Sequence, residues 1–163
     1  DYRIAGSHPK CKLGLPEVKL GLIPGWGGTQ RLPRLVGIAT AAEMLITGRS
    51  YSPLEAFAFG LVDEALPSEE LDAAVAVALA RSDWSARRNK RANAAVGDMP
   101  GDWSVQLSQL SKDERPAAAE ALRVVAEGAK LPLAQATAIE TDAFVPLLNG
   151  TAARRRIEAF LKK

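Results

Sequence analysis

Short apolar runs broken by glycine and proline fill the first part of the chain. Residues 1–5 have the composition of a strand, and between Lys12 and Trp26 the apolar residues are interrupted repeatedly by Gly and Pro. Proline removes a backbone donor and disfavours the helical conformation in the residue before it. This stretch therefore predicts short extended segments joined by tight turns, and alternation over residues 61–66 predicts one more half-buried strand.

Helix-start and helix-stop signals dominate the rest of the chain. Ser52-Pro53-Leu54-Glu55 is a capping box with proline at the first helical position, so a helix is expected to begin there and to end at Gly60. Thr29 is expected to cap a helix that runs toward Val36 and stops at Gly37. Further helices are predicted at residues 39–46, from Pro67 onward with an apolar stripe of Leu71, Val75, Ala78 and Leu79, at 116–126, after Pro132 with a bend or break at Pro146, and from Thr151 with Ile157, Phe160 and Leu161 as the buried edge.

The pattern divides the chain into three parts. Residues 1–81 mix short strands with helices, residues 82–115 lack sustained periodicity and are predicted to be a linker with some helix near 103–110, and residues 116–163 are predicted to be a helical tail. The first residues already have the composition of a strand, with no turn or capping signal before them. We therefore expect the chain to begin within a domain and, in isolation, to aggregate through open strand edges.

The composition is that of a soluble globular protein. The chain has 163 residues, a formal charge of +2 and 47% hydrophobic residues, and no window reaches the roughly 18 consecutive apolar residues of a membrane span. Cys11 is the single cysteine, so an internal disulfide is excluded, and neither a second cysteine nor a histidine cluster offers zinc ligands. We expect a cytoplasmic, reducing location, no metal and no membrane span.

Two basic runs, at residues 87–91 and 154–156, interrupt an otherwise mixed charge pattern. Neither is interleaved with aromatic residues, and neither belongs to a nucleic-acid-binding motif. Solvated helical or linker faces explain these runs better than phosphate-binding sites do. Nucleic acid is therefore not an expected partner.

Glu17 is the ionisable residue with the most informative surroundings. It lies between Pro16 and Val18, just before the glycine-rich loop of residues 25–29. Burial there would raise the pKa of its carboxyl group toward neutrality, as a general acid or base requires, although a solvated glutamate at a strand end fits the same pattern. The loop could bring backbone close to a ligand or could simply need glycine for positive φ, and it lacks the nucleotide-binding spacings GxxxxGK[ST] and GxGxxG. His8, next to Pro9, is expected to be a surface loop residue.

Four segments of residues 1–66 stand in the order and spacing of one known family: DYRIA, LGLPEVKLGLIPGWGGTQRLPRLVG, AAEMLITGR and SPLEAFAFGLVDEALP. They resemble the enoyl-CoA hydratase/isomerase (crotonase) superfamily. More narrowly, DWSARR and AIETDAFVPLLNGTAARRRIEAFL resemble the end of the hydratase region in the α-chain of multifunctional fatty-acid oxidation enzymes. The resemblance implies an α/β fold, the C-terminal portion of a crotonase-like spiral of ββα units, followed by an α-helical tail.

The resemblance also implies a site and a reaction. Glu17 matches the family's Pro-Glu glutamate, which acts as the acid/base at the α-carbon. Gly25 matches the glycine whose backbone lies against the catalytic water and the substrate, and Pro24 and Trp26 beside it are expected to be substrate-binding residues. The implied reaction is the addition of water to a 2-trans-enoyl-CoA in fatty acid β-oxidation, with the coenzyme A thioester as substrate and no further cofactor.

The family's second glutamate, in a GGG-x-E segment, and its oxyanion-hole donors have no match within residues 1–163, so we expect an incomplete site. Two alternatives stay open. One is an enoyl-CoA isomerase or another crotonase-type acyl-CoA enzyme, and the other is a non-catalytic helical assembly module formed by residues 116–163. The expected partners are an acyl-CoA and either further copies of the chain or partner domains of a β-oxidation enzyme.

Overall fold

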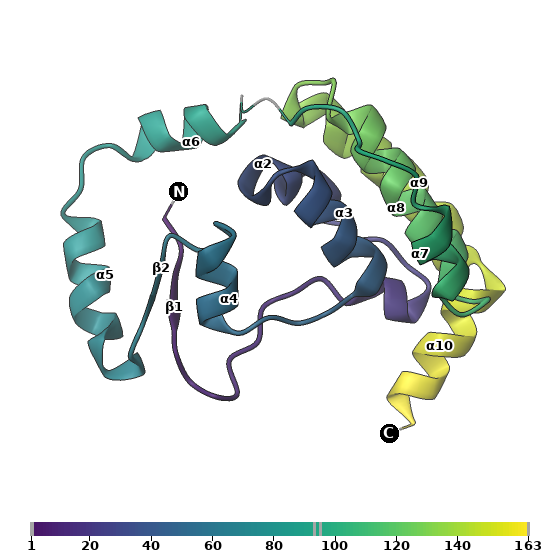
Figure 1. Cartoon of the computed structure of the whole chain (residues 1–163), viewed down its shortest axis with the longest axis horizontal. Helices are drawn as coiled ribbons and strands as arrows, with labels where there is room; N and C mark the ends of the chain where they lie inside the picture. Colours follow the sequence, from purple (N-terminus) through teal and green to yellow (C-terminus); the bar gives the residue numbers. More distant parts are fainter. Residues whose placement is uncertain (1, 93, 95, 163) are drawn as a thin grey trace.

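The computed structural model describes residues 2–92, 94 and 96–162. In that part of the chain, a small sheet and short helices come first, and longer helices follow (Figure 1). The first part contains β1 (Ile4–Gly6), the 3₁₀ helix η1 (Glu17–Leu20), α1 (Gly28–Arg31), α2 (Pro33–Val36), α3 (Ile38–Thr47), α4 (Pro53–Ala58), β2 (Glu64–Leu66), the 3₁₀ helix η2 (Ser68–Glu70) and α5 (Leu71–Leu79). The second part contains α6 (Trp84–Ala92), α7 (Ser104–Gln109), α8 (Arg115–Gly128), α9 (Leu133–Asn149) and α10 (Thr151–Leu161).

Strands β1 and β2 form a parallel pair, in which Ala5 lies opposite Ala65. Parallel strands need a long crossover, and here the crossover carries η1 and the helices α1 to α4. The strand predicted at residues 61–66 exists but is shorter, and all its residues are partly exposed instead of alternating. The reason is local: the N–H groups of Leu61 and Val62 donate to the carbonyl of Ala56 in the turn that ends α4, and so they are not free to pair with β1.

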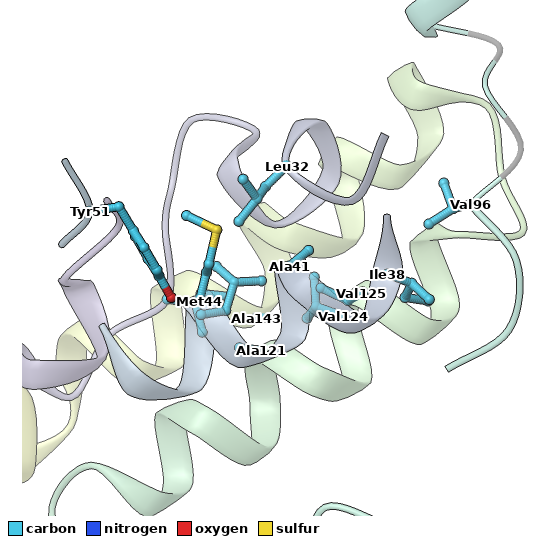
Figure 2. Packing of buried hydrophobic residues seen from close by; sticks show 12 residues of the cluster. Leu32, Ile38, Ala41, Met44, Tyr51, Val96, Ala121, Val124, Val125 and Ala143 are labelled. Carbon is cyan, nitrogen blue, oxygen red and sulfur yellow. The ribbon is translucent and has the colours of Figure 1, made fainter. Parts of the chain in front are cut away.

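The main core lies between α3 and the antiparallel pair α8 and α9. Figure 2 shows Met44 and Ala41 of α3 facing Ala121 and Val124 of α8, with Ala143 of α9 beside them. Full burial of a side chain as large as Val124 or Met44 stabilises the folded state by about 1.5–3 kcal/mol. The alanines at the contact let the helix axes approach closely. Residues 116–163 therefore share one core with residues 23–51 and do not stand apart from them.

Several helix predictions are confirmed. Ser52 and Glu55 form the capping box of α4: the Ser52 hydroxyl accepts from the Glu55 N–H at 3.3 Å, and the Glu55 carboxylate accepts from the Ser52 N–H at 2.8 Å. Helix α3 ends at Gly48 in the left-handed conformation. Helices α7 and α8 lie where the pattern placed them.

Other details differ from the predictions. The segment 82–115, predicted to be a linker with some helix near 103–110, also contains the helix α6, which its polar composition concealed. The stripe on α5 is mostly exposed, with Val75 and Leu79 in solvent and Ala78 buried, because α5 packs against little besides β1 and η2. On α10 the buried residue is Ala153, which lies against Gly21, while Phe160 and Leu161 are exposed.

Helix α9 continues through Pro146 without a break. Among the residues that the structure describes, no helix is both long enough and apolar enough to cross a membrane.

Candidate active site

Glu17 is the first residue of η1, directly after Pro16. The extended segments predicted here omitted this helical turn. Val18 anchors it by packing into the cluster formed by α3 and α8, and Gly21 ends it at φ +73°. The turn therefore fixes the glutamate on a short, rigid element at the edge of the core.

The Glu17 carboxyl group is partly buried, and its Oε2 atom has no hydrogen-bond partner among the described residues. Burial raises the pKa of Glu17, its own backbone N–H lowers that pKa in part, and the negative charge of Glu140 raises it further. A carboxyl group with a raised pKa and an unpartnered oxygen is suited to exchange a proton with a ligand. Burial is the main cause of the raised pKa, and the role of Glu17 as an acid or base stays a prediction.

Glu140 of α9 holds the glycine-rich loop in place. Its side chain is 1% exposed. One carboxylate oxygen accepts from the Gly27 N–H at 2.5 Å, and the other accepts from the Thr29 N–H at 2.9 Å and from the Thr29 hydroxyl at 2.5 Å. These donors lie at the N-terminus of α1, where a carboxylate is also favoured by the helix dipole. A glutamate more than 100 positions away thus performs the capping role predicted for Thr29.

The same helix supports the exposed end of the loop. Phe144, one turn after Glu140, lies so close to Gly25 that a Cβ atom on Gly25 would be 3.2 Å from its ring. Position 28 has no room for a side chain, because a Cβ atom there would be 2.5 Å from Pro24. Gly27 has a φ of +84°, which favours glycine. The backbone of Gly25 is left exposed to solvent above this support, as a backbone that contacts a ligand must be.

The helix predicted from Thr29 to Val36 is instead divided into α1 and α2 at Leu32 and Pro33. The buried Gln30 side chain donates to the carbonyl of Val124 at 3.0 Å and fills the space above Gly128. Thr29 is not the helix N-cap, since Gly27 takes that position. Tertiary contacts with α8 and α9 decide this geometry, and these could not be read from the local sequence.

The predicted site residues take different positions. Helix α9 connects Glu17 with the loop of residues 25–29 through Glu140. This residue is hydrogen-bonded to the loop, and its charge raises the pKa of Glu17. Pro24 is buried against Gly28, whereas the side chain of Trp26 is 99% exposed and contacts little of the chain. His8 is on the surface, as predicted. Among the described residues, no group of three His, Cys, Asp or Glu side chains is placed to hold a metal ion.

The sequence interpretation missed Glu140. A signal was present: Ala136, Ile139 and Ala143 form the apolar face of the predicted helix, and Glu140 lies on that face. A charged residue at a core position is rarely left unpaired. The sequence could therefore have shown that Glu140 has a specific partner, but it could not have shown which residue that partner is.

Comparison with known proteins identifies the family. The family model described as enoyl-CoA hydratase/isomerase matches residues 1–99, so the chain belongs to the enoyl-CoA hydratase/isomerase family. The chain is 35% identical over 158 residues to the fatty acid oxidation complex subunit alpha of Shewanella halifaxensis, a match that covers 90% of this chain and 22% of that protein. The chain thus spans about a fifth of the length of this relative.

Solved structures give the same fold. A candidate enoyl-CoA hydratase of Streptomyces avermitilis superposes with a TM-score of 0.61 at 26% identity, covering 99% of this chain and 48% of that one. A carnitinyl-CoA dehydratase of Mycobacterium thermoresistibile superposes with a TM-score of 0.68 at 24% identity, covering 99% and 55%, and this likeness shows the fold alone. The crotonase-like α/β fold with a helical tail is therefore confirmed, and the chain spans about half the length of these proteins.

Proposed function

We propose that this chain supplies the acid/base half of an enoyl-CoA hydratase site, in which water adds to a 2-trans-enoyl-CoA to give a 3-hydroxyacyl-CoA. The observation that carries the proposal is the carboxyl group of Glu17, which is partly buried, has a raised pKa and carries an oxygen without a partner among the described residues, on a rigid turn beside a loop clamped by Glu140. Family membership supports the substrate class.

In this reaction the water oxygen bonds to the β-carbon while the α-carbon receives a proton. Glu17 is proposed to deliver that proton, and to remove it in the reverse direction. A raised pKa keeps the carboxyl group protonated in a larger fraction of molecules near neutral pH, which favours donation. Gly25, whose backbone is exposed on the supported loop, is proposed to contact the water and the substrate, with Pro24 and Trp26 beside it.

Charge that gathers on the thioester oxygen during attack needs preorganised donors, which are often the largest catalytic contribution. The resemblance assigns those donors and a second glutamate to a GGG-x-E region, and residues 1–163 contain no such segment. We therefore propose that hydration needs two parts of the fold. One is this chain, and the other is the part of its structural relatives that has no counterpart in residues 1–163. We also propose that the complete fold works in fatty acid β-oxidation in the cytoplasm, within an oligomer or beside partner domains.

The test compares the chain with a fusion to the unmatched part of the Streptomyces avermitilis protein, placed before residue 1. Crotonyl-CoA hydration is followed by the loss of absorbance of the conjugated thioester. We expect hydration by the fusion and a loss of about 10²–10⁴-fold in kcat for Glu17→Gln. Glu69→Gln, at an exposed position on η2, is the matched control and should leave the rate unchanged. Full activity of the Glu17→Gln fusion would overturn the proposal.

One observation favours isomerisation as a second candidate. Of the two glutamates beside the loop in this chain, Glu140 is committed to three hydrogen bonds, and Glu17 is the one with an unpartnered carboxylate oxygen among the described residues. Moving a double bond from the 3- to the 2-position requires one proton to leave the α-carbon and one to reach the γ-carbon, and one carboxyl group can do both in turn. Conversion of 3-hexenoyl-CoA without crotonyl-CoA hydration, by the same fusion, would support this second candidate.

A further inference from the structure

A cavity lined by arginines lies beside α1, α2 and α6. Its volume is about 260 Å³, and its lining consists of Arg3, Arg31, Arg34, Arg88 and Arg91 together with Leu35, Ala92 and Leu133. These arginines come from the residue before β1, from α1 and α2, and from α6, so they are far apart in the sequence. No acidic residue is among the described residues that line it.

Asp63 lies next to this group. It accepts from Arg3 Nε at 3.0 Å, from Arg87 Nη2 at 3.1 Å and from Arg91 Nη2 at 2.5 Å, and Arg87 also pairs with Asp83 at 3.8 Å. Three guanidinium groups thus share Asp63, and Arg31 and Arg34 line the cavity as well. Burial lowers the pKa of Arg91, and the positive charges of Arg3 and Arg87 lower it further, as expected where like charges lie close together.

Two buried guanidinium nitrogens of the lining, Arg3 Nη1 and Arg34 Nε, have no hydrogen-bond partner among the described residues. Arg34 is 9% exposed. It cannot swing out freely, since its other nitrogens donate to the carbonyls of Gln30 at 2.8 Å, Gly128 at 3.1 Å and Leu131 at 2.7 Å. Buried donors are nearly always partnered in folded proteins, so a fixed, unpartnered guanidinium nitrogen in a positively charged cavity indicates a ligand with acceptor oxygens.

We propose that this cavity binds a phosphate group. Guanidinium groups match the geometry of phosphate oxygens in pairs of hydrogen bonds, and a phosphate dianion carries twice the charge of a carboxylate and one more acceptor oxygen or two, so it suits a cavity lined by several arginines. The basic run at residues 87–91 was predicted to be a solvated face. The fold changes this, because α6 turns Arg87 and Arg91, one helical turn apart, toward Asp63, and Arg91 also lines the cavity.

The site does not depend on the reaction proposed for Glu17, and the two can fail separately. The phosphate could come from free inorganic phosphate or from a larger molecule such as a coenzyme A thioester. Arg31 connects the two regions, because its side chain lines the cavity and also lies against Gly27, where a Cβ atom would be 2.8 Å from Arg31 Nε. A phosphate in the cavity would therefore lie one side chain from the loop.

The test is a calorimetric titration of the full chain with inorganic phosphate at low ionic strength. We expect saturable binding of one phosphate per chain, weakened about tenfold or more by Arg31→Gln and by Arg88→Gln, since each removes a charge-assisted hydrogen bond. Both side chains are exposed, so folding should be retained, which a thermal melt checks. Arg88→Lys keeps the charge and should restore part of the affinity. Arg154→Gln, exposed on α10, is the control with the same charge change and should bind as the unmodified chain does.

Absence of saturable binding would overturn the proposal. So would an equal loss of affinity in Arg154→Gln, which would mean attraction to the overall positive charge and not to the cavity. Competition separates the two sources: displacement of phosphate by coenzyme A but not by its 3′-dephospho form would identify the 3′-phosphate as the occupant. Failure of both to compete, with phosphate binding intact, would identify free phosphate.

Discussion

Two regions of this chain are each organised around one carboxylate, and they differ in what surrounds it. Glu140 is held by two backbone N–H groups and a hydroxyl, all neutral. Asp63 is held by three guanidinium groups. The first arrangement surrounds the carboxylate with neutral donors, and the second surrounds it with cationic ones.

The difference decides what each region can do. The uncompensated charge of Glu140 adds to the burial that raises the pKa of Glu17, so a structural clamp also prepares a neighbouring acid. Around Asp63, burial alone would raise the carboxyl pKa, but the hydrogen bonds from Arg3 and the charges of Arg3 and Arg91 lower it overall. Arg3 Nη1 and Arg34 Nε, which have no partner among the described residues, are the donors that we propose for an anion there. Neutral donors thus favour proton chemistry, and cationic donors favour anion binding.

The largest expected effect comes from removing the clamp. Glu140→Ala leaves the Gly27 and Thr29 N–H groups without their acceptor in a buried position, and we expect the free energy of unfolding to fall by about 3 kcal/mol. Urea denaturation measures it. Glu140→Gln keeps an acceptor oxygen and should lose less, whereas Glu158→Ala on the exposed face of α10 should change almost nothing. A loss no larger than in Glu158→Ala would mean that the loop does not depend on this residue.

Removing the carboxylate of Asp63 should lower the free energy of unfolding by less than removing that of Glu140. Asp63 is partly exposed, and solvent screens its interactions with the arginines. Asp63→Asn is expected to lower the free energy of unfolding by about 2 kcal/mol at neutral pH. The folded pKa lies below the unfolded value of about 3.9, so this stabilisation is present above the unfolded value and is lost as pH falls through the folded one. Denaturation at several pH values should show less acid sensitivity in Asp63→Asn than in the exposed control Asp72→Asn.

Glu17→Gln should act in the opposite direction. The folded pKa of Glu17 is raised, so its contribution is most favourable below the unfolded value of about 4.3 and is lost as pH rises through the folded value. At neutral pH the substitution is expected to stabilise the fold slightly, by about 0.5 kcal/mol, since part of the group is solvated. Unfolding curves at acidic and neutral pH test this against Glu43→Gln. A variant less stable than the original chain at neutral pH would contradict the raised pKa.

The smallest expected effect is that of Trp26→Ala. A side chain that is 99% exposed contributes little to folding, and its removal should change the free energy of unfolding by less than about 0.5 kcal/mol. Trp103→Ala is the matched control. Trp103 packs against the cluster formed by Val18, α3 and α8, so its removal should lower the free energy of unfolding clearly more. If Trp26→Ala is neutral for folding but raises KM in the fusion assay, the residue serves the substrate, as predicted.

The sequence determined much of this protein without tertiary information. The capping box at Ser52 and the stop at Gly48 follow from local backbone chemistry, which acts over a few residues. The family segments also identified the fold and singled out Glu17. Its raised pKa was predictable, because burial between apolar neighbours has the same effect on any carboxyl group.

Only the tertiary structure decided which distant groups meet. Glu140 reaches the loop of residues 27–29, and Arg31, Arg34 and Arg88 reach a common cavity, because the packing of α3 against α8 and α9 and the placement of α6 bring them together. No local pattern encodes such a meeting, since each residue's own segment is compatible with a solvated side chain. Hydrogen bonds and charges in a protein interior act over a few ångströms in space, whatever the separation along the chain.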